Sequence, residues 1–359
     1  MSKLSIKDIA KALNISTATI SYVLNGKARE MRISDSLEKK ILKFARDNNY
    51  QPSKLPISLR TGRTDIICLM VEDIADNFFA AIAGRIAELA RPLGIKVVYM
   101  STDNDTEKTR ELIADFRRQN VDGFIISPPP GIESDIRQLI SDEIPVVLFD
   151  RPLKNVRTPY VGVDNGKSSE NAVMHLYNQG FRHAAFITLD SDQGQMADRL
   201  NGYKRAAGRT GMPVLVKKIG FAERDTPAAV EKIARFLSSK SGIDAVFFAT
   251  GSLALSGLEA LQLLSWKIGH DVGMVVFDDN NFLRAHSPSI TAVAQPVNEL
   301  CEALVNLLST NLTGKNNKKT EKIILPTKLV VRQSSMPLPA ANPVTTPATA
   351  PIAAKHKIG

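Results

Sequence analysis

The stretch SIKDIAKALNISTATISYVLN, residues 5–25, decides how this chain is organised. Ser5 can cap a first helix, in which apolar residues from Ile6 to Leu13 recur at helical spacing, and Ser16 can cap a second. Two short helices joined by a tight turn predict a helix-turn-helix, whose second helix can enter the major groove of DNA. An ordinary helical hairpin with a solvated polar side is the alternative. On the second helix we expect Ile20, Val23 and Leu24 to face inward and Thr17, Ala18, Ser21 and Tyr22 to face outward.

Positive charge is concentrated around this stretch. Residues 1–63 contain 13 Lys or Arg and 5 Asp or Glu, a net charge of +8 in a chain whose total is +9. The other 296 residues therefore carry a net charge of only +1. A basic surface confined to one small helical segment is typical of a module that binds nucleic acid phosphates. This distribution favours the DNA-binding interpretation over the plain hairpin.

The N-terminal segment resembles the DNA-binding module of the LacI/GalR family of bacterial repressors. The resemblance rests on residues 5–27, a third helix near Ser34 to Asn48, and the segments YQP (50–52) and SLRTGR (58–63). It implies that Thr17, Ala18 and Tyr22 read operator bases, while other polar residues lie nearer the phosphates. The DNA-binding residues expected in the helical module, residues 1–50, are Ser5, Ser16, Thr17, Ala18, Thr19, Ser21, Tyr22 and Asn25.

Residues 51–64 form a polar and basic connector. In the family this segment becomes a hinge helix on DNA, and the resemblance implies that Leu59 wedges into the minor groove beside Arg60. Pro56 stands where the family usually has Ala. Because proline is tolerated only in the first turn of a helix, the hinge helix either begins late, near Leu55, or is weakened.

Length and composition indicate the class of protein. A chain of 359 residues suits two or three domains, and 43% apolar residues are enough for substantial cores. The two cysteines, Cys68 and Cys301, lie in apolar surroundings, which predicts buried thiols in a reducing compartment. The N-terminus has no apolar signal core, and no apolar run is long enough to span a membrane. We therefore expect a soluble cytoplasmic protein, associated with the nucleoid.

From Asp65 onward, short apolar strands alternate with helices. This pattern predicts parallel sheets that are covered on both faces. The expected strands are 66–71, 97–100, 123–126, 146–149, 160–163, 184–187, 214–219, 245–248 and 274–277. The expected helices are 78–93, 107–119, 132–140, 168–178, 199–210, 227–237, 253–264 and 297–308.

The same region is similar to the type I periplasmic-binding-protein fold that follows the DNA module in these repressors. The fold class is thus an all-α DNA-binding module plus a bilobal α/β effector and dimerisation domain, residues 65–335. The lobes are expected at about 65–161 with 292–322 and 162–291 with 323–335, and residues 336–359, rich in Pro, Ala and Thr, as a disordered tail. The similar segments are DIADNFF (73–79), VDGFIIS (121–127), IPVVLFDRP (144–152), VGVDN (161–165), DRLNGYKRA (198–206), VVFDDN (275–280) and ITAVAQPVNEL (290–300).

Open α/β sheets bind ligands beyond the carboxyl ends of their strands. Carboxylates and a guanidinium there can chelate the hydroxyls of a polyol while an aromatic ring packs on its C–H groups. The family usually has a carboxylate where Ser252 stands, so Ser252 can cap a helix but one effector contact is missing. The expected effector-binding residues are Phe78, Phe79, Asp150, Gln193, Gln195, Arg199, Phe221, Thr250, Ser252 and Asp278.

The sequence therefore predicts a transcriptional regulator, a repressor that binds palindromic operator DNA as a homodimer and responds to a small-molecule effector. A sugar is the expected effector, with a nucleobase or nucleoside as the alternative. A sugar-binding transport receptor fits less well, because it requires a signal peptide and no basic helical head. An enzyme also fits less well, since the chain has no nucleophile elbow, phosphate loop or metal-spaced His or Cys cluster. No cofactor and no membrane partner are expected.

Overall fold

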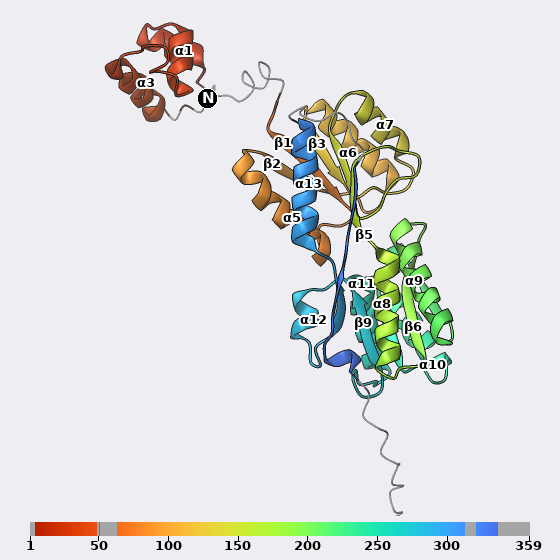
Figure 1. Ribbon diagram of the computed structural model, residues 1–359. Coiled ribbons are helices and arrows are strands. Elements are labelled where there is room, and N and C mark those ends of the chain that lie inside the picture. Colours follow the sequence, from red (N-terminus) through yellow and green to blue (C-terminus); the bar gives the residue numbers. More distant parts are fainter. Residues whose placement is uncertain (1–3, 49, 51–62, 313–320, 337–359) are drawn as a thin grey trace, which may run out of the picture. The chain divides into compact units, whose positions relative to one another are not determined.

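The computed structural model describes residues 4–48, 50, 63–312 and 321–336. The chain divides into two compact units, Met1–Thr64 and Asp65–Gly359. Figure 1 shows the helices of the first unit and the two sheets of the second. The expected hinge residues Leu55, Pro56, Leu59 and Arg60, and nearly all of the expected tail, lie outside the described residues.

The first unit consists of three helices, α1 (Ile6–Leu13), α2 (Thr17–Leu24) and α3 (Asp35–Asp47). Ser5 caps α1 in a reciprocal capping box, because its Oγ accepts from the Asp8 backbone N–H while the Asp8 carboxylate accepts from Ser5 N at 2.8 Å. Ser16 caps α2 through its Oγ, which accepts from Thr19 N. The three helices pack around one small core, which contains Ile9, Ala10, Ile20, Val23, Ala28 and Ile41. The helix-turn-helix expected from residues 5–25 is present.

The first lobe of the second unit is built on a six-stranded parallel sheet in the order β11-β5-β4-β3-β1-β2. Its strands are β1 (Ile66–Val71), β2 (Lys96–Ser101), β3 (Gly123–Ile126), β4 (Val146–Phe149), β5 (Tyr160–Val163) and β11 (Lys322–Leu325), and its helices are α5 (Asn77–Ala90), α6 (Thr106–Arg118), α7 (Glu133–Ser141) and α13 (Val297–Leu312). Helices α5 and α13 supply the core on one face, and α6 and α7 supply the core on the other. The short helix η1 (Arg91–Leu93) follows α5.

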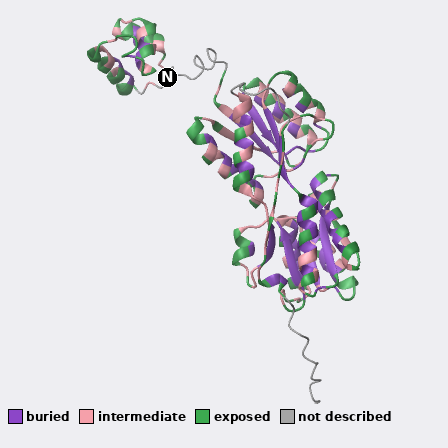
Figure 2. Ribbon diagram, viewed as in Figure 1, coloured by how far each residue is buried: buried purple, intermediate pink, exposed green. Residues whose placement is uncertain are grey.

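The second lobe has a sheet in the order β12-β10-β9-β8-β6-β7, parallel except for the antiparallel pairing of β12 with β10. Its strands are β6 (Ala184–Asp190), β7 (Leu215–Gly220), β8 (Ala245–Phe248), β9 (Gly273–Phe277), β10 (Thr291–Ala294) and β12 (Lys328–Val330). Its helices are α8 (Asn165–Asn178), α9 (Gly194–Thr210), η2 (Phe221–Glu223), α10 (Pro227–Ser239), α11 (Gly251–Leu263), α12 (Asn281–Ala285) and η3 (Gln333–Ser335). The buried strands stand out at the centre of each lobe in Figure 2.

The chain crosses between the lobes three times, a few residues later than expected. The boundaries expected after residues 161, 291 and 322 each fall inside a strand, namely β5, β10 and β11. Each of these strands pairs over its length with one sheet, so it belongs entirely to one lobe. The crossings therefore follow Val163, Ala294 and Leu325.

The start of α9 differs from the sequence expectation, whereas the state of the two cysteines agrees with it. Helix α9 begins at Gly194 rather than at Arg199, which brings Gln195 onto its first turn. Cys68 and Cys301 are buried free thiols, as expected. Among the described residues, no helix is both long and apolar enough to cross a membrane.

Candidate functional site

The second helix of the helix-turn-helix presents a small polar face to solvent. Ile20 and Val23 are buried in the core of the first unit, while Thr17 and Ala18 are exposed and Tyr22 is 36% exposed. These three exposed residues lie within two turns of one helix, so they form one continuous surface. A hydroxyl, a methyl group and a phenol are the groups that this surface offers to a DNA base edge.

The other expected DNA-binding residues hold the ends of the helices. The Oγ of Ser16 shares a 2.8 Å hydrogen bond with the Oγ1 of Thr19, and both lie at the start of α2. At the other end, the amide of Asn25 donates to the backbone oxygen of Ser21 at 2.8 Å and contacts its hydroxyl at 3.3 Å. These side chains therefore fix the two ends of α2 and with them the geometry of its exposed face. They also lie where they can reach DNA phosphates at either end of the helix.

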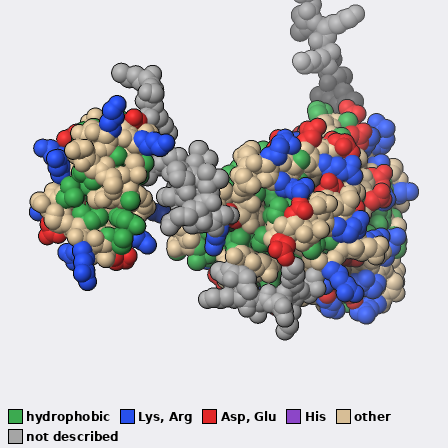
Figure 3. Space-filling model, turned by 90° about the horizontal axis from the view of Figure 1, so that it is seen from above, with side chains coloured by type: hydrophobic (Ala, Val, Ile, Leu, Met, Phe, Trp, Pro, Cys, Tyr) green, Lys and Arg blue, Asp and Glu red, His purple; other side chains and the backbone are tan. Residues whose placement is uncertain are grey.

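The basic residues of the first unit are exposed around these helices. Figure 3 shows Lys and Arg side chains on several sides of the first unit, whereas basic and acidic side chains are mixed over the second. Such a surface attracts the phosphates on either side of a groove. The exposed basic residues in the described part of the first unit include Lys7, Lys11, Lys27, Arg29, Arg32, Lys39, Lys40, Lys43 and Arg46.

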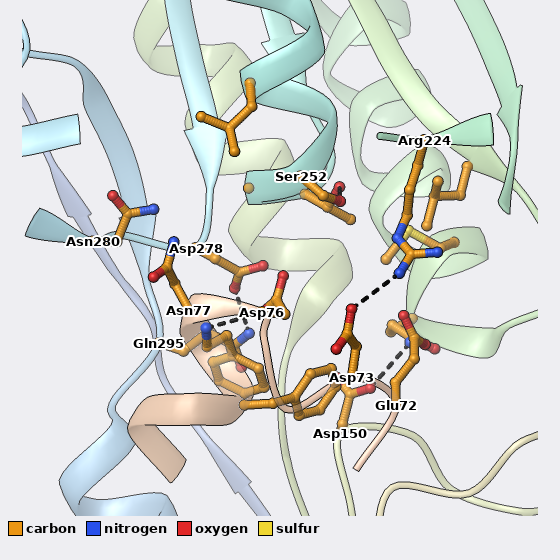
Figure 4. A pocket seen from close by; sticks show the side chains of 18 of the residues that line it. Glu72, Asp73, Asp76, Asn77, Asp150, Arg224, Ser252, Asp278, Asn280 and Gln295 are labelled. Atoms are coloured by element: carbon orange, nitrogen blue, oxygen red, sulfur yellow. Dashed lines mark hydrogen bonds and ion pairs between the residues drawn. The ribbon is translucent and has the colours of Figure 1, made fainter. Parts of the chain in front are cut away.

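A cavity of about 240 Å³ lies between the two lobes of the second unit, at the carboxyl ends of their strands. Its wall combines residues that follow β1 and β4 of the first lobe with residues that follow β6, β7, β8 and β9 of the second (Figure 4). The lining residues are Glu72, Asp73, Ala75, Asp76, Asn77, Phe78, Phe79, Asp150, Leu189, Gln193, Gln195, Met196, Arg199, Arg224, Asp225, Thr250, Gly251, Ser252, Leu255, Asp278, Asp279, Asn280 and Gln295.

Nine of the ten expected effector-binding residues line this cavity, and Phe221 does not. Phe221 begins the turn η2 after β7, and its ring packs against the core of the second lobe. The guanidinium of Arg224 lies 4.3 Å above that ring and donates to the Phe221 carbonyl oxygen at 3.1 Å. Phe221 therefore supports Arg224, and Arg224 takes the place in the wall that was expected for Phe221.

Sequence reasoning missed several polar residues of the wall. Glu72, Asp73 and Asp76 follow β1, and their position after a buried strand is a signal that could have found them. Gln295 lies in the crossing after β10, a strand that the sequence did not reveal. The remaining polar residues that were missed are Asn77, Arg224, Asp225, Asp279 and Asn280.

Arg199 lies buried in the part of the cavity wall that the second lobe provides, and several contacts fix its side chain. Its guanidinium stacks over the Phe277 ring at 3.5 Å. Its Nε donates to Asn165 Oδ1 at 2.8 Å, and its Nη1 donates to the Ala249 carbonyl oxygen at 2.6 Å. Nη1 also lies 3.7 Å from the carboxylate of Asp278. Because these contacts fix the guanidinium plane, Arg199 can present its remaining N–H groups to a ligand in a preorganised orientation.

Asp150 and Asp278 occupy equivalent places in the two lobes, directly after β4 and β9. Both have left-handed backbone conformations, with φ of 64° and 77°. Asp adopts such conformations more readily than most residues, and here they turn the chain directly after each strand. Gln295 donates to Asp278 at 2.6 Å (Figure 4). Burial raises the pKa of the Asp278 carboxyl above its ordinary value, and Asp150 adds to this effect while Arg199 opposes it.

Three polar contacts join the two lobes across the cavity. Gln193 Nε2 donates to Glu72 Oε2 at 2.9 Å, and Gln195 Nε2 donates to Asp150 Oδ2 at 3.1 Å. The third joins Arg224 Nη2 to Asp73 Oδ2 at 3.4 Å (Figure 4). These three distances are short enough to couple the arrangement of the lobes to whatever occupies the cavity.

Ser252 does not cap α11, contrary to the sequence expectation. Thr250 caps the helix, because its Oγ1 accepts from Leu253 N at 3.2 Å. Ser252 lies in the first turn, and its hydroxyl shares a 3.1 Å hydrogen bond with that of Thr250. This corner of the wall therefore offers two hydroxyls to a ligand.

Two family models match separate parts of this chain. The model of bacterial regulatory proteins of the lacI family matches residues 5–53, and the periplasmic binding protein-like domain matches residues 173–335. The first match contains the helix-turn-helix, and the second begins in α8 and covers most of the second lobe.

Relatives and solved structures match over nearly the whole length. The transcriptional regulator DegA of Bacillus subtilis is 28% identical over 94% of this chain and 99% of its own length. The ribose operon repressor of Halalkalibacterium halodurans is 29% identical over 92% of this chain and 97% of its own. In fold, the chain is similar to the lac repressor dimer bound to operator and an anti-inducer, with a TM-score of 0.80, 19% identity and coverage of 93% of this chain and 100% of that one.

The basic helix-turn-helix, the bilobal α/β unit with its interlobe cavity, and the relatives that share both parts agree with one another. The chain is a sequence-specific DNA-binding transcriptional regulator, and it belongs to the LacI family of bacterial regulatory proteins.

Proposed function

We propose that this protein is a repressor whose operator affinity is controlled by a carbohydrate bound between the two lobes of its second unit. The cavity carries this proposal, because its wall combines both lobes and is bridged by side-chain contacts. A ligand that touches both lobes favours one arrangement of the lobes over another, and only such differential binding can shift a conformational equilibrium.

The chemistry of the wall supports a carbohydrate. Carboxylates, amides, hydroxyls and the fixed guanidinium of Arg199 can pair with closely spaced hydroxyl groups. Phe78 and Phe79 pack edge to face at 5.2 Å and provide an aromatic surface for sugar C–H groups. One relative is a ribose operon repressor, which is consistent with an effector of this class.

On DNA, two copies of the chain would bind the two halves of a palindrome, because the symmetry of a dimer is mirrored in its operator. Thr17, Ala18 and Tyr22 would contact base edges, and Leu59 with Arg60 would engage the minor groove between the half-sites, as the family resemblance implies. The likeness in fold to a lac repressor dimer bound to its operator supports association of two chains.

In this proposal the effector is an inducer, and the protein acts in the cytoplasm at the nucleoid without enzymatic activity. Effector binding closes the lobes and weakens the hold of the DNA-binding units on the operator. The free thiols Cys68 and Cys301 fit a reducing compartment. The charged residues of the cavity are largely engaged in pairs and hydrogen bonds, an arrangement that suits binding and closure.

A thermal-shift screen followed by an operator-release assay tests the proposal. The full-length protein is screened against sugars, sugar phosphates, nucleobases and nucleosides, because a ligand that binds the folded state raises its melting temperature. Each hit is then added to a complex of the protein with selected operator DNA, followed by fluorescence anisotropy. A sugar that stabilises the protein and releases DNA supports the proposal. A nucleobase or nucleoside as the active class, or a sugar that tightens DNA binding, contradicts the effector class or the inducer role respectively.

A further inference from the structure

The wall of the interlobe cavity contains many more acidic than basic side chains. Seven carboxylates line it, against the two guanidinium groups of Arg199 and Arg224. Two more arginines stand behind the wall, Arg151 and Arg332. Even with these included, four guanidinium groups face seven carboxylates. The carboxylates are Glu72, Asp73, Asp76, Asp150, Asp225, Asp278 and Asp279.

All four arginines already lie close to carboxylates of the protein itself. Arg332 forms a bidentate pair with Asp279, at 2.7 and 2.8 Å. Arg224 is shared between Asp73 and Asp225, with nitrogen–oxygen distances of 3.4 and 3.3 Å. Pairing in these parts of the wall therefore leaves neither Arg332 nor Arg224 for the remaining carboxylates.

Among the described residues, the remaining carboxylates of the wall share arginines or have no close arginine partner. Arg151 is shared between Glu72, at 2.5 Å, and Asp150, at 3.3 Å. Arg199 lies no closer than 3.7 Å to Asp278. Within the described part of the chain, Asp76 has no Lys, Arg or His as an ion-pair partner. Its carboxylate only accepts from the backbone at the start of α5, including Phe78 N at 2.9 Å.

Asp76 and Asp278 lie near each other on opposite lobes (Figure 4). Burial raises the pKa of Asp76 to about 6, and repulsion from Asp278 and Glu72 adds to the shift while two backbone hydrogen bonds oppose it. The charged groups that face Asp76 are thus Asp278 from the end of β9, Glu72 from the end of β1 and Arg199 from α9. The two carboxylates create a region of negative potential that Arg199, whose guanidinium faces both, neutralises only in part.

A second observation also calls for a hydrogen-bond donor. Gln195 lines the cavity and is only 3% exposed, and its amide nitrogen is oriented by a bond to Asp150. Its amide oxygen Oε1 is buried and has no hydrogen-bond partner within the described residues. An unpartnered buried acceptor costs free energy until a donor reaches it. A ligand that occupies this cavity should therefore be rich in donors.

We propose that the effector is an amino sugar, whose protonated amino group is held by Asp76 and Asp278. This inference rests on the proposed function, since it specifies the chemistry of the effector in the same cavity. An ammonium supplies three donors and no acceptor, which matches an acceptor-rich wall. The hydroxyls of the sugar ring serve the guanidinium of Arg199 and the amide oxygen of Gln195.

The size and charge of the cavity disfavour larger ligands, metal ions and anionic sugars. A volume of about 240 Å³ lies below the roughly 300–1,000 Å³ of pockets for drug-sized ligands, so one monosaccharide is the appropriate size. In the described part of the chain, no group of three or more His, Cys, Asp or Glu is arranged to hold a metal ion. A sugar phosphate or sugar acid would add negative charge to an acidic wall, which is unfavourable.

Matched sugar triplets test this proposal by isothermal titration calorimetry of the full-length protein. Each triplet contains a hexosamine, the parent hexose and the N-acetylated hexosamine, in the gluco, galacto and manno series. We expect one hexosamine to bind at least tenfold more tightly than its parent hexose, and acetylation to remove this advantage. Equal or tighter binding of the parent hexose overturns the amino-sugar proposal while leaving a carbohydrate effector intact. Absence of binding by every member also overturns the amino-sugar proposal, and the thermal-shift screen then decides separately whether another carbohydrate is the effector.

Variants and pH provide an independent readout. Asn also caps helices well, so Asp76→Asn keeps the start of α5 while removing one charge, and it should abolish the preference for the hexosamine. The control is Glu88→Gln, an exposed carboxylate on the same helix that pairs with Arg85, and it should retain the preference.

Hexosamine affinity should fall as the pH drops through about 6, because Asp76 becomes protonated while the amine stays charged. An unchanged preference in Asp76→Asn, or affinity independent of pH between about 5 and 7.5, overturns the assigned contact.

Discussion

Gln195 of the second lobe donates a 3.1 Å hydrogen bond to the Asp150 carboxylate of the first lobe, across the cavity that we assign to the effector. The arrangement of the lobes is thereby tied to side chains that a ligand must touch. Lobe closure around a ligand is a common switching motion, and here the parts that would transmit it are already in contact. Removing one of these contacts should therefore alter the response to effector without altering the DNA-binding surface.

Arg224→Met should weaken effector binding about tenfold, which corresponds to ~1.4 kcal/mol. The variant no longer pairs with Asp73 across the cavity but keeps most of the apolar packing on the Phe221 ring. Calorimetry with the effector found in the thermal screen measures the change. Lys232→Met is the matched control, because Lys232 pairs with Glu223 within one lobe at 2.7 Å. Equal affinities in the two variants would show that the pairing across the cavity contributes nothing to binding.

Tyr22→Ala and Thr17→Ala should change which operator sequences are preferred while leaving effector affinity unchanged. Both side chains lie on the exposed face of α2, remote in sequence from the cavity residues. Removing a side chain that reads a base should cost about 1–3 kcal/mol at one operator position. Selection from a randomised operator library, compared with the parent protein, gives the preference directly.

The control for base recognition is Lys43→Ala on α3, where an exposed basic side chain can meet phosphates. It should weaken binding to all sequences to a similar extent and reduce the slope of log K against log salt by about 1. If Tyr22→Ala behaves like Lys43→Ala in both respects, the tyrosine does not read bases.

The sequence predicted most of the sheet architecture because the central strands are continuous apolar runs between polar segments. β3, β4 and β8 begin and end at the expected residues for this reason. β11 and β12 were missed, since they lie at sheet edges, carry only exposed and partly exposed side chains, and contain only four and three residues. β11 pairs with β5, which lies far earlier in the chain, so no local pattern reveals it.

Site residues were predictable where the carboxyl end of a strand could be located. Asp150 and Asp278 directly follow predicted strands, and both line the cavity. Arg224 was missed because it follows a turn, η2, that carries its side chain past Phe221 to the wall. The charge imbalance around Asp76 was equally hidden, because it depends on which arginines pair with which carboxylates in three dimensions.

Cys68 and Cys301 should react very slowly with a thiol reagent such as DTNB in the native protein at pH 8. Burial raises the pKa of each thiol to about 12, so roughly one molecule in 10⁴ carries a thiolate at that pH. Both side chains are also fully buried. Unfolding in guanidinium chloride should release two reactive thiols per chain. Rapid labelling of either cysteine under native conditions would reveal local opening of the first lobe, where both thiols lie.

Gly202→Ala and Gly208→Ala should have opposite effects on the stability of the second lobe, although both glycines lie in α9. A Cβ at Gly202 would approach the carbonyl oxygen of Gly166 in α8 to 2.1 Å, so the two helices must separate. Overpacking of this kind costs about 1–3 kcal/mol. A Cβ at Gly208 meets nothing within 4 Å, and alanine in an exposed helix position should stabilise by about 0.5–1 kcal/mol. Urea unfolding of both variants measures the difference, and equal stabilities would mean that α8 and α9 do not pack at Gly202 as closely as the fold requires.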